Sequence, residues 1–157
     1  LIEDRADIVL GGPPPSAPIQ GLQFKEMMQS QWCLVTAKDH PLTKTSLPLT
    51  NEMMTAYTSI VIKDSSRQSP IQSHRIMAKQ KQIKVASMAQ KISLIEAGIG
   101  IGFLPRHKIQ GKLDEGTLVT LETAEPAQRT PQYCSWKRNN KGKAARWFID
   151  RILSDKV

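Results

Sequence analysis

The chain has 157 residues, of which 39% are hydrophobic and 23% charged, as in ordinary globular proteins. This length suits one sizeable domain or two small lobes, and no apolar run is long enough to cross a membrane. The 22 Lys and Arg residues exceed the 14 Asp and Glu residues, and the net charge of +8 favours anionic partners. Cys33 and Cys134 form neither a disulfide framework nor a metal-binding motif, so we expect free thiols.

The first part of the chain contains two predicted strands. Residues 1–5 lack a Met and the apolar stretch of a secretory signal, and we interpret them as the last turn of a helix inside a longer protein. A strand over residues 6–10 ends at Gly11 and Gly12, before three consecutive prolines. Residues 32–37 are almost continuously apolar, which is typical of a strand buried on both faces of a parallel sheet.

The middle of the chain alternates helices and strands. We expect a short helix over residues 50–56, a strand over residues 57–62 and then a loop that carries Ser65, Ser66 and Arg67. Residues 69–72 combine a capping box with a proline at the first helical position, which predicts a helix to about residue 80.

The clearest local pattern is a strand followed by a capped helix. After a strand over residues 83–86, Ser87 and Gln90 have the spacing of a capping box. Apolar residues then recur at the period of one buried helical face, at Met88, Ile92 and Ile95. Lys91 lies in the first turn, where contact with an anionic ligand and exposure to solvent both remain open.

A run of glycines follows this helix. Gly98 stands where a left-handed C-terminal cap belongs, and residues 99–104 alternate apolar residues with glycine as a strand. Pro105 then suits the first turn of another helix. A dinucleotide fingerprint has the opposite order, strand then glycines then helix, so we interpret these glycines as a cap and as close helix–strand packing.

The last part of the chain repeats the alternation. We expect a helix over residues 105–113, strands over residues 117–121 and 131–137, and an amphipathic helix over residues 143–153 whose inward residues are Phe148, Ile149, Ile152 and Leu153. The one basic cluster (Lys137, Arg138, Lys141, Lys143 and Arg146) has no interleaved aromatic residues, so we interpret it as a solvated loop and helix start.

Alternating strands and helices predict an α/β fold, in which ligands bind beyond the carboxyl ends of the strands. This rule selects three loops, and their candidate residues are Gly11, Gly12, Ser65, Ser66, Arg67, Ser87 and Met88. Hydroxyls and helix amides suit a small polar or anionic molecule. For residues 65–67, a purely structural turn is an equally open interpretation.

Motifs for catalysis or for a cofactor are missing from the sequence. There is no G-x-S-x-G elbow, no H-E-x-x-H motif and no phosphate-binding loop. The three histidines (His40, His74 and His107) fall in a turn, within a helix and at a helix start, so we expect surface or capping roles. We therefore expect neither an enzyme, nor a metal, nor a cofactor.

Five stretches in order resemble the effector-binding domain of LysR-type transcriptional regulators over nearly the whole chain. They are R-A-D-I-V-L-G, D-H-P-L, A-G-I-G-I-G-F-L-P, L-D-E-G-T-L-V-T-L and the closing strand and helix. The stretches D-S-S-R and S-M-A-Q-K are also similar to the branch that includes the allantoin-responsive activator.

This resemblance implies a two-lobe, periplasmic-binding-protein-like (type 2) α/β domain with mixed, mostly parallel sheets and an incomplete first lobe. Residues 1–37 would belong to the first lobe and one hinge strand, residues 38–130 to the second lobe, and residues 131–157 to the returning hinge strand and the final helix of the first lobe. Cys33 and Cys134 would then lie on neighbouring strands. The seven candidate residues match the family's effector contacts in the cleft between the lobes.

The resemblance further implies a cytoplasmic sensor that binds a small-molecule effector, self-associates as a dimer or tetramer and contacts DNA only through an absent N-terminal domain. Three alternatives remain open. They are a solute-binding module of a transporter, which requires export, an enzyme on the same fold, and DNA binding through the positive charge alone.

Overall fold

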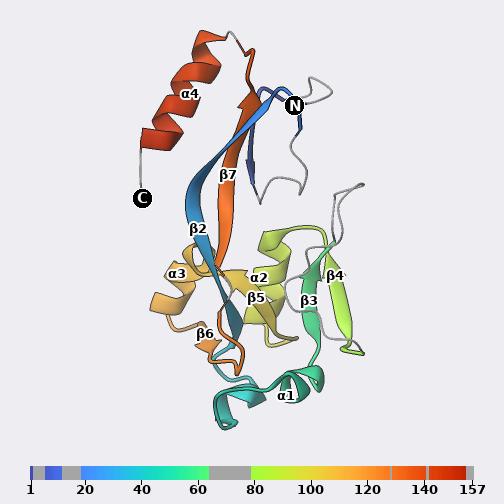
Figure 1. The fold of residues 1–157 in the computed structure, drawn as a ribbon. Coiled ribbons are helices and arrows are strands. Elements are labelled where there is room, and N and C mark those ends of the chain that lie inside the picture. Colours follow the sequence, from blue (N-terminus) through green and yellow to red (C-terminus); the bar gives the residue numbers. More distant parts are fainter. Residues whose placement is uncertain (2–5, 12–18, 64–78, 128, 141, 155–157) are drawn as a thin grey trace. The chain divides into compact units, whose positions relative to one another are not determined.

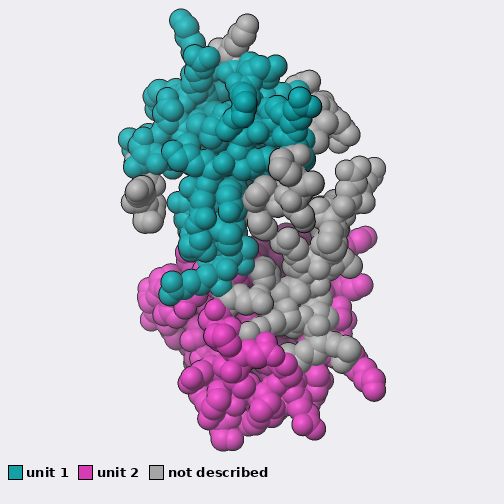
Figure 2. Space-filling model, in the orientation of Figure 1, with its two compact units in different colours: residues 1–30, 129–157 teal, residues 31–128 magenta. Residues whose placement is uncertain are grey.

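The computed structural model describes residues 1, 6–11, 19–63, 79–127, 129–140 and 142–154 (Figure 1). The chain divides into two compact units, which Figure 2 shows in different colours. Unit 1 consists of residues 1–30 and 129–157, and unit 2 consists of residues 31–128. The predicted helices at residues 1–5 and 69–80 fall almost wholly outside the described residues. None of the described helices is long and apolar enough to span a bilayer.

Unit 1 is built on strands that come from both ends of the chain. Strand β1 (Ile8–Gly11) pairs antiparallel with β7 (Arg129–Lys137). Strand β2 (Leu22–Ala37) begins in unit 1 and lies next to β7 in the order of strands. These two strands carry Cys33 and Cys134, so the prediction of neighbouring strands is confirmed, and both thiols are free.

Helix α4 (Lys143–Ser154) closes unit 1, and one predicted inward residue is wrong. Ile149 is buried, and Ile152 and Leu153 are half-buried, as predicted. Phe148 is 54% exposed and instead packs edge-on against Trp147, with the ring centroids 5.2 Å apart. Phe148 lies about 100° around the helix from Ile149, which turns its ring off the narrow buried stripe.

Unit 2 contains the remaining elements. They are the end of β2, η1 (Pro41–Lys44), α1 (Asn51–Thr55), β3 (Ser59–Ile62), β4 (Gln82–Val85), α2 (Met88–Glu96), β5 (Gly102–Pro105), α3 (Arg106–Asp114) and β6 (Leu118–Leu121). Strands β3 and β4 are parallel, and a parallel bridge joins Ser59 to Ile101, immediately before β5.

The pairing of β2 corrects one prediction. Residues 32–37 were expected in a parallel sheet, but β2 runs antiparallel to both β5 and β6. The apolar run reflects burial on both faces, which does not depend on the direction of the neighbouring strands. The sheets are therefore mixed, with antiparallel pairing around β2 and parallel pairing at β3 and β4.

Two hydrophobic clusters fill unit 2, one on each face of β2. Leu34 belongs to the cluster of η1 and α1, with Leu42, Leu49 and Met54. Val35 faces the opposite way and joins the cluster beneath α2 and α3, with Ile60, Ile95, Leu104, Ile109 and Leu118. Because side chains alternate along a strand, the continuous apolar run of β2 supplies both clusters.

The glycine run packs as predicted. Gly98 has a φ of +73° at the C-terminal end of α2, a conformation that only glycine adopts without strain. A Cβ atom on Gly100 would lie 2.4 Å from the carbonyl oxygen of Thr58, so no larger residue fits there. Pro105, by contrast, is the N-cap of α3 and not part of its first turn, because its ψ of 123° is extended.

Candidate functional site

The start of α2 is a capped helix end with free backbone donors. The hydroxyl of Ser87 accepts a hydrogen bond from the amide of Gln90 (3.2 Å). The Gln90 side-chain oxygen accepts from the amide of Ala86 (2.9 Å), one residue before the position predicted by the capping box. The amides of Met88 and Ala89 have no acceptor inside the helix, and their dipoles favour an anion at this end.

This helix start lies at the edge of the sheet where β3 also ends. Ile62 and Val85 are partners in the parallel register, and the amide of Lys63 donates to the carbonyl of Val85 (2.7 Å). The chain therefore leaves β3 beside the point where β4 leads into α2. The carboxyl ends of β3 and β4 therefore lie at one edge of unit 2.

The predicted site residues have different positions. Ser87 and Met88 are adjacent at the start of α2, with Ser87 exposed and Met88 half-buried. Gly11 ends β1 in unit 1, opposite Tyr133, and no atom lies within 4 Å of the position that a Cβ would take. The other predicted residues, Gly12, Ser65, Ser66 and Arg67, lie outside the described residues.

Lys91, for which the sequence left both ligand contact and solvent exposure open, is buried. Its side chain is only 8% exposed, and its Cε atom lies 2.8 Å from the position of a Cβ on Gly102. Burial lowers the pKa of its ammonium group to about 8. The sequence did contain a sign of this burial. Lys91 lies three residues after Met88 and four before Ile95, so it falls on the apolar face of α2.

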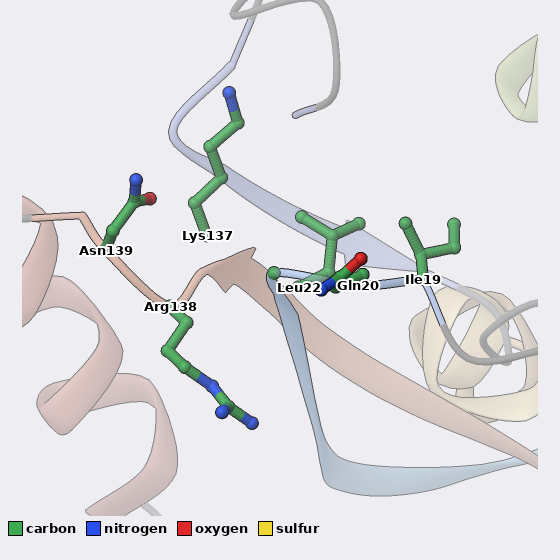
Figure 3. Close-up of a pocket in the computed structure, with 7 residues that line it drawn as sticks. Ile19, Gln20, Leu22, Lys137, Arg138 and Asn139 are labelled. Carbon is green, nitrogen blue, oxygen red and sulfur yellow. The ribbon is translucent and has the colours of Figure 1, made fainter.

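Two cavities are lined by described residues, and neither contains a predicted site residue. An open groove of about 580 Å³ lies along β4 and α2, lined by Lys84, Val85, Ala86, Ala89, Gln90, Ser93 and Leu94. A cavity of about 570 Å³ in unit 1 is lined by Ile19, Gln20, Gly21, Leu22, Lys137, Arg138 and Asn139. Figure 3 shows the Lys137 and Arg138 side chains pointing in opposite directions, so their charges do not converge there.

Burial also shifts the pKa of two other groups in unit 2, Cys33 and His40. Burial raises the pKa of the Cys33 thiol against the opposing effect of Arg106, and the thiol lies 3.5 Å from the carbonyl of Leu104. His40 caps η1 by accepting from the amide of Leu42, and burial lowers its pKa. In the part of the chain that the structure describes, no group of three or more His, Cys, Asp or Glu residues could hold a metal ion.

Comparison with protein families identifies the domain. The family described as the LysR substrate binding domain matches residues 1–156. The chain belongs to this family. Its fold is accordingly that of LysR regulatory domains, which is the two-lobe, periplasmic-binding-protein-like α/β fold predicted above, with mixed sheets.

The LysR substrate binding domain of this chain is similar to domains of transcriptional regulators. It is 29% identical to an uncharacterized HTH-type transcriptional regulator, YeeY of Escherichia coli K12, over 157 residues. The match covers 99% of this chain and 50% of YeeY, so the chain spans about half the length of that relative.

Two solved structures similar to this chain are complexes with a small molecule. The CcmR regulatory domain of Synechocystis PCC6803, in complex with 2-PG, has a TM-score of 0.75 and 15% identity, covering 99% of this chain and 76% of that one. The effector binding domain of QuiR, in complex with shikimate, has a TM-score of 0.72 and 18% identity, covering 99% of this chain and 74% of that one. At these identities the likeness establishes the fold.

Proposed function

We propose that this LysR substrate binding domain senses a small polar or anionic metabolite and thereby modulates transcription by a DNA-binding regulator. The observation that carries the proposal is the meeting of the β3 end with the capped start of α2 at one edge of unit 2. Such an edge offers hydroxyls and helix amides to an anionic group. The proposed ligand contacts are Gly11, Gly12, Ser65, Ser66, Arg67, Ser87 and Met88.

Two of the fold relatives support a small-molecule ligand. QuiR is described with shikimate, a hydroxylated carboxylate, and CcmR with 2-PG. For this chain we extend the proposal to binding without turnover, self-association, a cytoplasmic location and DNA contact through a separate domain. The assignment of residues 1–37 and 131–157 to one lobe, and of residues 38–130 to the other, is part of the same proposal, supported by the division of the chain into two units.

A thermal-shift screen against small carboxylates, ureides and nucleosides tests this function. A ligand that binds only the folded state raises its stability by about 2.7 kcal/mol at a hundredfold excess over the dissociation constant. Ser87→Asp keeps an N-cap but places a negative charge at the helix start, so we expect it to abolish the shift produced by an anionic ligand.

Ser93→Ala is the matched control for this screen, because Ser93 is an exposed serine farther along the same helix. We expect it to retain the full shift. Equal shifts in Ser87→Asp and in the unchanged chain would contradict the proposed site, and the absence of any stabilising compound would contradict the sensing function.

A further inference from the structure

Lys91 is a buried cation for which the described residues provide no counter-charge. Its side chain is 8% exposed, and its ammonium group makes no hydrogen bond or ion pair within the described ranges. The stem lies against Gly102 of β5 beside Ile95, where a Cβ on Gly102 would be 2.8 Å from the Lys91 Cε atom. The aliphatic stem of Lys91 is therefore packed within unit 2, and a charged group on a side chain buried to this extent is unfavourable without an anion.

Within the described ranges, the elements around Lys91 carry no carboxylate that could pair with it. The strand segments of unit 2 on this face (residues 31–37, β3, β4 and β5) contain no Asp or Glu, and neither α2 nor α3 has an acidic residue in its first turn. Glu96 of α2 is engaged by Lys112 of α3, with an N–O distance of 2.6 Å. Asp114 of α3 accepts a hydrogen bond from Gln110.

Lys91 lies one helical turn after the start of α2. It follows Ser87 by four residues, and the amide of Lys91 donates to the carbonyl of Ser87, so the two residues lie on the same face of the helix. Long side chains in helices lean toward the N-terminus. Helix α2 has nine residues, long enough for its free amides and dipole to act on an anion at that end.

We propose that Lys91 is the residue that recognises an anionic oxygen group, a carboxylate or a phosphate, of a ligand bound at the start of α2. The inference rests on the proposed function for the position of the ligand, and it adds the chemical class and the residue that selects it. Ser87 and the helix amides can hold any polar group, whereas a buried ammonium without a partner favours a charged one. A neutral analogue, such as the amide of the same acid, would leave Lys91 unpaired.

The titration of Lys91 in the presence of simple anions tests this inference without knowledge of the natural ligand. Lysine side chains are isotope-labelled in the 157-residue chain, and the Lys91 signal is assigned by its loss in Lys91→Met. Its titration midpoint is measured by NMR in chloride, in inorganic phosphate and in acetate at equal ionic strength. Lys108, an exposed lysine in the first turn of α3, serves as the internal control.

We expect phosphate, acetate or both to raise the Lys91 midpoint by about one pH unit, because a nearby anion favours the charged form. The Lys108 midpoint should stay the same. A rise in phosphate alone identifies a phosphate group as the ligand chemistry, and a rise in acetate alone identifies a carboxylate. A Lys91 midpoint that is the same in all three salts overturns the inference.

This outcome is distinguishable from failure of the proposed function. If the Lys91 midpoint does not move but a compound still stabilises the chain in a Ser87-dependent way, only the role of Lys91 is wrong. If the midpoint moves but no compound of the screen stabilises the chain, Lys91 is an anion site and the sensing function is wrong.

Discussion

The two units differ in how their described residues are stabilised. Both hydrophobic clusters belong to unit 2, where residues such as Leu34 and Ile95 are almost completely buried. Among the described residues of unit 1, the buried hydrophobic ones are Cys134 and Ile149, while Val9, Leu10, Trp147 and Phe148 are exposed. Unit 1 therefore depends on the pairing of β1, β7 and β2, and unit 2 on a closed core. The proposed site at the start of α2 belongs to unit 2, the better-packed of the two units.

The largest expected change in stability comes from truncating a buried leucine in unit 2, and an exposed leucine in unit 1 serves as the comparison. Leu34 is 2% exposed and Leu10 is 56% exposed, and both lie on strands. In the 157-residue chain, we expect Leu34→Ala to lower the free energy of unfolding by about 4 kcal/mol, through lost burial and a cavity. Leu10→Ala should change it by less than about 0.5 kcal/mol. Urea unfolding measures both, and equal losses would remove the distinction between the units.

Lys91 is the exception within the closed core, and its replacement should stabilise the chain. The folded-state pKa of about 8 lies below the ordinary value of 10.5. Below pH 8 both states hold the proton, so folding bears the full desolvation penalty of roughly 3 kcal/mol. Between pH 8 and 10.5 only the unfolded state keeps the proton, and stability rises with pH. Lys91→Met should therefore raise the free energy of unfolding at pH 7 by up to about 3 kcal/mol.

The same measurement across pH checks the sign of this effect. The gain from Lys91→Met should shrink as the pH rises from 8 and vanish above 10.5. Lys108→Met, on the exposed side of α3, should leave stability nearly constant throughout. A loss of stability in Lys91→Met at pH 7 would show that the ammonium is already paired in the folded state.

A smaller effect is expected from filling the space beside two glycines. A Cβ on Gly100 would collide with the backbone oxygen of Thr58, whereas nothing lies within 4 Å of a Cβ on Gly11. We expect Gly100→Ala to lower the free energy of unfolding by about 2 kcal/mol through overpacking, and Gly11→Ala to have little effect. Thermal unfolding compares the two, and a well-tolerated Gly100→Ala would contradict the tight packing of β3 against the residues before β5.

Local patterns predicted the features that local interactions decide. Ser87, Gly98 and the apolar stripe of α2 were recognisable because a cap, a left-handed turn and a helical period each depend on a few consecutive residues. The first half of β2 was not predicted, since residues 22–31 are largely polar and only their pairing with distant strands makes them extended. Local propensity carries no information about such partners.

The predictions that were wrong, and the one left open at Lys91, depended on contacts between distant residues or on how much of a helix is buried. The antiparallel direction of β2 is set by β5 and β6, which lie more than sixty residues later in the chain. The burial of Lys91 depends on the absence of a side chain at Gly102, on another element. The helical period placed Phe148 on the apolar face of α4. Unit 1 buries only part of that face, and Phe148 lies outside the buried part.

The most direct test of the proposed site adds each compound that stabilises the chain in the thermal screen to the isotope-labelled protein. The NMR chemical shifts of the backbone amides are measured during this titration. The account predicts the largest shifts at the amides of Met88 and Ala89, which have no acceptor inside α2. Shifts concentrated instead on residues 19–22 and 137–139, which line the cavity of unit 1, would contradict it.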